Sequence, residues 1–270
     1  MVAVTLAVLR ESYRPILLDR RVKRLRKETG NPDLYSALPH PGSGVEAVKK
    51  SLSRPFFLLT TSPIVFLPAF GLAVIYGLMI LMISTLAVVF QDRYGFSVGS
   101  SGLAYLGFGV GLIAGLIAFA FTSDRAYESL VARTGGAPKP EMRLAPITIG
   151  SPLACIGLIV YGWGIQEEVH WMLPLVGSAI FATAIIAFIM PVTTYLIEVF
   201  RQLAAGPVGA SAVLRSVVGG VLPLCANSLY NQLGLGWGNT LLAFIALVFT
   251  PLPWLFYRNG EELRRRFPPK

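Results

Sequence analysis

The chain has 270 residues, of which 54% are hydrophobic and 14% are charged, with a formal net charge of +9 and a mean hydropathy of +0.64. Soluble domains carry about 25% charged residues, so this composition excludes an ordinary soluble globular protein and indicates an integral membrane protein. The positive charge does not indicate a nucleic-acid partner, because the basic residues lie between and beyond the apolar runs, where they set membrane orientation.

The first 62 residues contain no apolar run long enough to cross a bilayer. Residues 1–9 are apolar but short, and we interpret them either as a surface segment or as the remnant of a preceding transmembrane helix. Residues 10–62 are hydrophilic and basic, and we expect a cytosolic central loop. Within it, the run from Leu18 to Glu28 favours a short basic amphipathic helix suited to an anionic lipid surface. Gly30 and Pro32 should end that helix.

Six apolar runs follow, each long enough for a bilayer core about 30 Å thick, which takes about 20 residues of helix. We expect spans at 64–90, 101–122, 145–164, 171–197, 207–230 and 237–257, which form a lobe at 63–257, and a basic cytosolic tail at 258–270. The fold class is therefore all-α membrane protein, and the six spans divide as three plus three, as inverted repeats do. Small residues let neighbouring membrane helices approach closely. The second span has several: Gly102, Gly107, Gly109, Gly111 and Gly115.

Orientation follows from the basic residues. If six spans are counted, every lysine and arginine except Arg93 and Arg215 lies on the side of the two termini. Because cytosolic loops carry the excess of Lys and Arg, both termini are expected in the cytosol.

Arg215 is the sharpest candidate for a functional residue. It lies about eight residues, or ~12 Å, inside its span. One interpretation is a cation that faces a cavity, where it binds an anionic substrate group or partners a carboxylate that titrates. The other is a structural arginine that reaches the interface or bonds helix carbonyls.

Other polar residues in or near the spans are candidates for lining a substrate cavity, although hydrogen bonds between helices explain them equally well. They are Tyr76, Tyr105, Tyr195 and Asn227.

Four charges lie at the expected cytosolic ends of two spans. Asp124 and Arg125 end the second span, and Glu198 and Arg201 end the fourth. We interpret them as candidate gating charges that lock these ends together and separate during a conformational change. The alternative is solvated interface charge of little energetic weight.

The sequence lacks the motifs of several other classes of protein. It contains no GxxxxGK[ST] phosphate loop and no HExxH zinc motif, and its two histidines are far apart. We therefore expect no cofactor, no metal and no catalytic residues, and a membrane-embedded enzyme has no nucleophile–base pair to support it.

Four stretches resemble one family in chain order. RESYRPILLDRRVKRLRKETGNPDL is similar to the end of the sixth helix and the central loop of fungal major facilitator superfamily (MFS) transporters of the drug:proton antiporter-like, polyamine/multidrug branch. GLAYLGFGVGLIAGLIAFAFTSDRAYESL resembles the eighth helix, and PEMRLAPITIGSPLACIGLIVYGWGIQEEVHWMLPLVG the ninth and tenth. AVLRSVVGGVLPLCANSLYNQLGLGWGNTLLAFIALVFTPLPWLFYRNGEELRRRF resembles the eleventh and twelfth.

The resemblance implies one half of a twelve-helix, two-lobed carrier that works by alternating access and exports drugs or organic solutes, coupled to protons, at the plasma membrane. Its partners would be the bilayer, a small organic substrate, protons and a missing N-terminal six-helix lobe. Arg10 stands where the family has a proline; Glu198 keeps the family's acid, but Pro207 and Gly209 depart from its pattern. The alternative is a truncated half-transporter without transport activity of its own.

Overall fold

The computed structural model describes residues 14–31, 33–35, 57, 59–133, 135, 138–201 and 204–266. All regular secondary structure in these ranges is helical, as expected for an all-α protein. The chain divides into two compact units, Met1–Ser53 and Arg54–Lys270. The segment 1–9, interpreted above as a helix remnant, lies outside the described residues.

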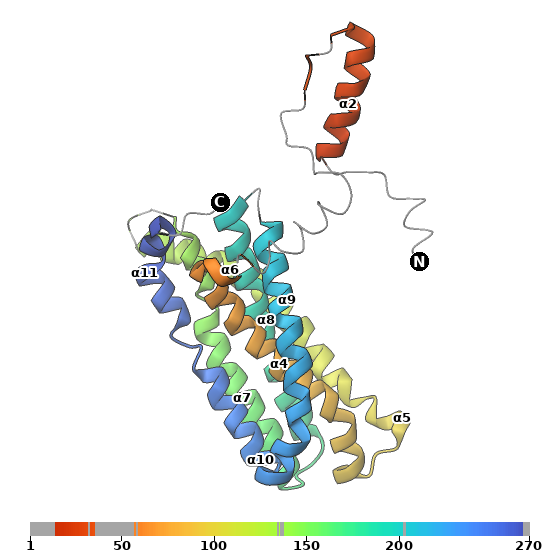
Figure 1. Cartoon of the computed structure of the whole chain (residues 1–270). Coiled ribbons are helices and arrows are strands. Elements are labelled where there is room, and N and C mark those ends of the chain that lie inside the picture. The colour runs from red at the N-terminus through yellow and green to blue at the C-terminus, as the bar shows by residue number, and fades with distance from the viewer. Residues whose placement is uncertain are drawn as a thin grey trace. The chain divides into compact units, whose positions relative to one another are not determined.

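In the first unit, the basic run forms the helix α2, Arg14–Thr29 (Figure 1). Gly30 follows with a φ of 66°, a left-handed conformation that glycine adopts without steric cost. Its N–H donates to the carbonyl oxygen of Arg26 at 3.1 Å, which ends the helix. The helix expected at Leu18 to Glu28 is therefore present and begins earlier, at Arg14.

The second unit is a bundle of long helices. In chain order it contains α4 (Pro63–Tyr94), α5 (Val98–Ser101), α6 (Ala104–Arg133), the 3₁₀ helix η1 (Pro140–Leu144), α7 (Ile147–Gln166), α8 (Met172–Phe200), α9 (Ala205–Val221), the 3₁₀ helix η3 (Leu222–Cys225), α10 (Ala226–Leu247) and α11 (Leu252–Arg266). Five segments of the described chain are long and apolar enough to cross a membrane: Pro63–Tyr94, Val98–Arg133, Pro140–Gln166, Met172–Phe200 and Ala205–Arg266.

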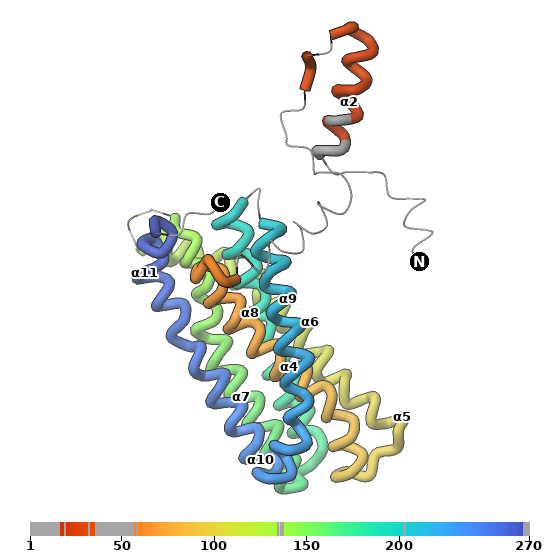
Figure 2. The backbone as a smooth tube through the Cα atoms, viewed as in Figure 1, coloured from red at the N-terminus to blue at the C-terminus, as the bar shows by residue number. Residues whose placement is uncertain are grey.

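The last of these segments folds back on itself. At Gly234 the backbone has a φ of 76° and a ψ of 171°, which are not helical. Figures 1 and 2 show α9 and the first part of α10 running along the bundle in one direction, and the rest of α10 and α11 running back in the other. Gly234 falls in the connection expected between the spans 207–230 and 237–257. Ahead of this reversal, Pro223 interrupts the α-helix as a short 3₁₀ turn, because proline has no N–H to donate.

The helix α8 lies at the centre of the bundle and contacts both α6 and α7. In addition, α4 packs against α9, and α7 packs against α10. Small residues make these contacts close. A Cβ at Gly157 of α7 would stand 2.5 Å from the backbone nitrogen of Phe181 in α8, and one at Gly177 of α8 would stand 2.6 Å from that of Tyr161 in α7. Helices that meet backbone to backbone in this way gain dispersion contacts along their length.

Candidate functional site

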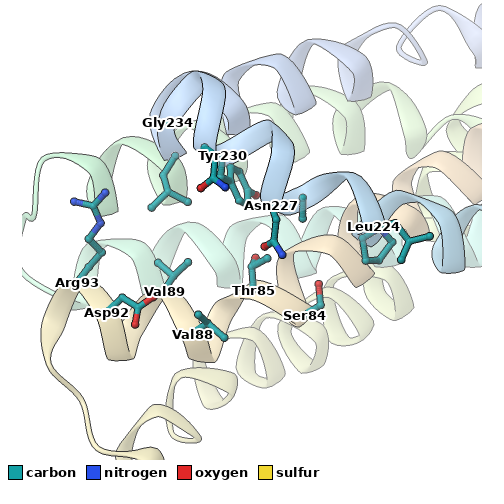
Figure 3. A pocket seen from close by; sticks show the side chains of 14 residues that line it. Ser84, Thr85, Val88, Val89, Asp92, Arg93, Leu224, Asn227, Tyr230 and Gly234 are labelled. Atoms are coloured by element: carbon teal, nitrogen blue, oxygen red, sulfur yellow. The ribbon is translucent and has the colours of Figure 1, made fainter.

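A cavity of about 580 Å³ lies between α4 and the segment formed by η3 and α10 (Figure 3). Its volume falls within the range of small-molecule sites, about 300–1,000 Å³. Its wall mixes apolar and polar side chains, among them Ser84, Thr85 and Asp92 of α4, Leu224 of η3, and Asn227 and Tyr230 of α10. We call this the α4–α10 cavity. Such a lining suits non-covalent binding of a molecule with both apolar and polar parts.

Most polar groups of the cavity wall already have partners. The hydroxyl groups of Ser84 and Thr85 donate to the carbonyl oxygen of Leu81 at 2.8 and 3.0 Å. The Tyr230 hydroxyl donates to Oδ1 of Asn239, a fully buried residue, at 3.4 Å. Asn227, by contrast, makes no side-chain hydrogen bond to any described residue. Asp92 and Asn231 of the same wall likewise have no side-chain partner among the described residues, so these three groups are free to bind a ligand.

Arg215 of α9 lies beside Tyr76 of α4. The carbon of its guanidinium group is 4.8 Å from the centre of the Tyr76 ring, within the range of a cation–π contact. Both residues are partly buried, and no described carboxylate forms an ion pair with Arg215. Ser84, the first residue of α4 that lines the cavity, lies eight residues after Tyr76, about 12 Å along the helix. Neither Arg215 nor Tyr76 lines the α4–α10 cavity.

The other two cavity candidates are placed differently. The hydroxyl group of Tyr105 in α6 donates to the carbonyl oxygen of Ile83 in α4 at 3.0 Å and so links two helices. Tyr195 of α8 is fully buried, and its ring packs edge-on against Phe256 at 5.7 Å. Tyr195 therefore belongs to the packed core, where α11 covers it, and does not line the α4–α10 cavity.

At the end of the bundle where α6, α8 and α11 finish, Arg143 joins two of the candidate gating charges. Its Nη1 lies 2.9 Å from Oδ1 of Asp124, and its Nε lies 2.8 Å from Oε1 of Glu198. The guanidinium group also lies over the ring of Tyr127, 4.1 Å from its centre. The side chains of Arg143 and Glu198 are 20% and 30% exposed and so are partly shielded from water, whereas that of Asp124 is 78% exposed. We call this group the Arg143 network.

Arg125 and Arg201, the remaining candidate gating charges, are not part of this network. Both are exposed, and neither forms an ion pair with any described residue. Arg201 ends α8 with a φ of 43°. Arg143 thus brings together the two acidic residues, Asp124 and Glu198, that were expected to gate this end. In the sequence, Arg143 counted only as one of the basic residues that indicate membrane orientation.

A second ion pair at the same end is more deeply buried. Glu141 of η1 has a side chain only 2% exposed, and its Oε1 lies 3.0 Å from Nε of Arg264 in α11. Arg264 Nη2 also donates to the other carboxylate oxygen at 3.2 Å. A Cβ at Gly260 would stand 2.6 Å from Cγ of Glu141, so only glycine leaves room for the carboxylate here. This pair fixes α11 against η1, and sequence reasoning missed it.

Neither a metal-ligand cluster nor a disulfide is found among the described residues. No group of three or more His, Cys, Asp or Glu in the described ranges is placed to hold a metal ion. The two cysteines, Cys155 and Cys225, are not joined in a disulfide. What the site provides is an amphipathic cavity, a cation near an aromatic ring and a charged network at one end.

These features define a multi-pass membrane protein. The chain is 45% identical over 261 residues to the MFS-type transporter hepF of Aspergillus oryzae, an alignment that covers 97% of this chain and 53% of the relative. It is 44% identical to the MFS-type transporter penM of Penicillium rubens, over 97% of this chain and 52% of that protein. It is 40% identical to the MFS transporter eqxG of Fusarium heterosporum, over 97% of this chain and 54% of that protein.

The chain spans about half the length of the curated relatives it matches. No family model and no solved structure matches it.

Proposed function

We propose that the chain is the C-terminal six-helix lobe of a fungal MFS transporter that moves small organic molecules across a membrane by alternating access. The observation that carries this proposal is the 45% identity to a protein named as an MFS-type transporter over 97% of the chain. The five apolar segments support it, because the fifth, with its reversal at Gly234, supplies the fifth and sixth crossings. Both termini then lie in the cytosol with the basic residues.

In this proposal the α4–α10 cavity is one half of a substrate site, and the missing N-terminal lobe supplies the other half. Transporters with paired lobes bind substrate near the midplane between them. The cavity lies in a single lobe and is lined by residues of α4, η3 and α10 alone. Asn227 is the candidate that lines this cavity, and we assign Tyr76, Arg215 and Tyr105, which lie outside its lining, to the surrounding substrate path. Arg215 binds an acidic group of the substrate or a carboxylate of the other lobe, since no described carboxylate neutralises it.

The Arg143 network serves in this proposal as the cytosolic lock. It joins the ends of α6 and α8 through one arginine held between two carboxylates. Opening the lobe toward the cytosol requires these ends to separate, and the ion pairs break when they do. The proposal also includes proton-coupled export of drugs or other organic solutes, and a location in the plasma membrane. Both are based on the resemblance of the sequence to the drug:proton antiporter-like branch.

The test is dye efflux from yeast cells, using dyes that full-length hepF exports in the same assay. Three proteins are compared: the chain alone, the chain fused behind the N-terminal half of hepF, and full-length hepF. We expect efflux from the fusion and none from the chain alone. A fusion that reaches the plasma membrane at normal amounts but exports no dye would contradict the transport proposal. Efflux by the chain alone would contradict the need for a second lobe.

Arg215→Gln in the active fusion separates the two interpretations of this arginine. If Arg215 contacts substrate, efflux of acidic dyes falls at unchanged protein amount, whereas the control Arg133→Gln, at an exposed arginine without an ion pair in the described chain, has no effect. Unchanged efflux with lower thermal stability would assign Arg215 a structural role through its contact with Tyr76.

The second candidate is a truncated half-transporter without activity of its own. The chain spans only 53% of hepF, which favours this candidate if no other segment accompanies the chain in the cell. Co-expression with the separate N-terminal half of hepF tests it: recovered efflux without covalent fusion shows that the lobe is competent and only needs its partner.

A further inference from the structure

The helix α2 of the first unit carries exposed leucines on a strongly basic helix. Leu18 and Leu25 are 37% and 38% exposed, and their seven-residue spacing places them on one face. Leu17 is 42% exposed on the neighbouring face. The half-buried Val22 lies between Leu18 and Leu25 on the same face. This apolar strip is narrow, so burying it would give only weak binding without a second source of attraction.

The second source is positive charge. A hollow of about 480 Å³ on α2 is lined by Arg20, Arg21, Arg24, Leu25 and Glu28. Glu28 accepts a hydrogen bond from Nε of Arg24 at 2.7 Å, which leaves an excess of guanidinium groups in the hollow. Lys23, Arg26 and Lys27 are exposed on the remaining surface. Arginine side chains therefore lie directly beside one of the exposed leucines.

We propose that α2 is a binding site for the headgroups of anionic phospholipids, with the helix lying in the plane of the membrane surface. Guanidinium groups bind phosphate oxygens through paired hydrogen bonds. Leucines next to them can enter the boundary between headgroups and acyl chains. Clusters of Lys and Arg on an amphipathic helix are attracted to the negative cytosolic leaflet in proportion to their number. The proposal rests on the cytosolic orientation given above, and does not require that the chain transports anything.

A membrane is favoured over a soluble acidic partner because of the sequence that follows α2. The stretch from Gly30 to Ser62 ties the helix to α4, an apolar helix long enough to cross a membrane. A tethered site meets the lipid surface at a high effective concentration, so even weak individual contacts suffice. A nucleic acid or an acidic protein would use the arginines but would leave the exposed leucines in water.

The experiment uses the full chain in lipid nanodiscs, with Cys155 and Cys225 replaced by alanine and a single NBD fluorophore on Leu25→Cys. Discs of phosphatidylcholine alone are compared with discs that contain about 30% phosphatidylserine. We expect NBD fluorescence to rise about twofold or more, with a blue shift, only in the anionic discs, because the label enters a less polar region. About 0.5 M salt should reverse the change by screening the charges.

The matched variants remove two charges each. Arg21→Gln with Arg24→Gln should abolish most of the fluorescence rise, whereas Arg265→Gln with Arg266→Gln, at exposed arginines of α11, should leave it intact. Equal fluorescence in neutral and anionic discs would overturn the proposal. So would a response to inositol hexakisphosphate in neutral discs without a response to phosphatidylserine, because α2 would then bind a soluble polyanion.

Discussion

The contact between α6 and α8 allows a sharp test of helix packing, because one of two nearby glycines of α6 meets α8 and the other does not. A Cβ at Gly111 would overlap the carbonyl oxygen of Ala179 and stand 2.6 Å from its Cα, whereas a Cβ at Gly109 would have no neighbouring atom within 4 Å. The carbonyl oxygen of Gly111 also accepts a hydrogen bond from Oγ1 of Thr183 at 2.9 Å. Gly111→Ala should therefore destabilise the bundle, and Gly109→Ala should not.

The size of the effect follows from these contacts. Non-bonded carbon atoms sit about 3.5–4.0 Å apart, so α6 must move about 1 Å away from α8 to admit the new methyl group. Overpacking of this kind costs about 1–3 kcal/mol, and a stretched hydrogen bond costs about 0.5–1.5 kcal/mol. Alanine in place of glycine returns about 0.5–1 kcal/mol in either helix position. We expect a net loss of about 1–3 kcal/mol for Gly111→Ala and a small gain for Gly109→Ala.

Both variants are heated in the same detergent over a series of temperatures. Size-exclusion chromatography then measures the fraction of protein that remains monodisperse at each temperature, and this fraction gives Tm. At about 2–4 °C per kcal/mol for a domain of this size, Gly111→Ala should lower Tm by roughly 2–12 °C. Equal Tm values for the two variants would refute the close approach of α6 and α8 at this position.

Three further variants test the polar contacts by the same unfolding assay. Arg143→Gln should lower Tm by several degrees because it leaves two carboxylates without their shared cation, while Arg125→Gln should leave Tm unchanged; equal shifts would contradict the network. Glu141→Gln should cost about 3 kcal/mol because it leaves a partly buried arginine unpaired, and a Tm equal to that of the parent would contradict the ion pair. Gln166→Ala removes the acceptor for the N–H of Gly236, 2.6 Å away, and should cost about 1 kcal/mol and speed hydrogen exchange at that amide; unchanged exchange would rule this hydrogen bond out.

Composition and apolar run length predicted the all-helical membrane fold, because a bilayer imposes its thickness on the sequence directly. The glycines of the second span were predicted to permit close approach, but the sequence did not separate Gly111 from Gly109. That distinction depends on which face of α6 meets α8, and a span surrounded by lipid and protein is apolar on every side, so its sequence does not reveal the buried face.

The charged end was predicted only in part for a similar reason. Asp124 and Glu198 were recognised from their positions at the ends of two spans, but the arginine between them was not, because η1 brings Arg143 there through tertiary packing. Tyr195 looked like a polar group available to a cavity, yet it points into the core against Phe256. The contact between Arg215 and Tyr76 required knowing that α9 packs on α4, and residues so far apart in sequence carry no local signal for this.

The backbone of a single residue decides at which end of the bundle α11 and its arginines lie. The segment from Ala205 to Arg266 has 62 residues, and as one straight helix it would be about 93 Å long, roughly three bilayer cores. The left-handed conformation of Gly234 instead returns the chain to the end from which it came. Any side chain there would meet Oε1 of Gln166 at about 3.0 Å and strain the backbone. The position of α11, and with it the ion pair between Arg264 and Glu141, therefore depends on a hydrogen atom in place of a side chain.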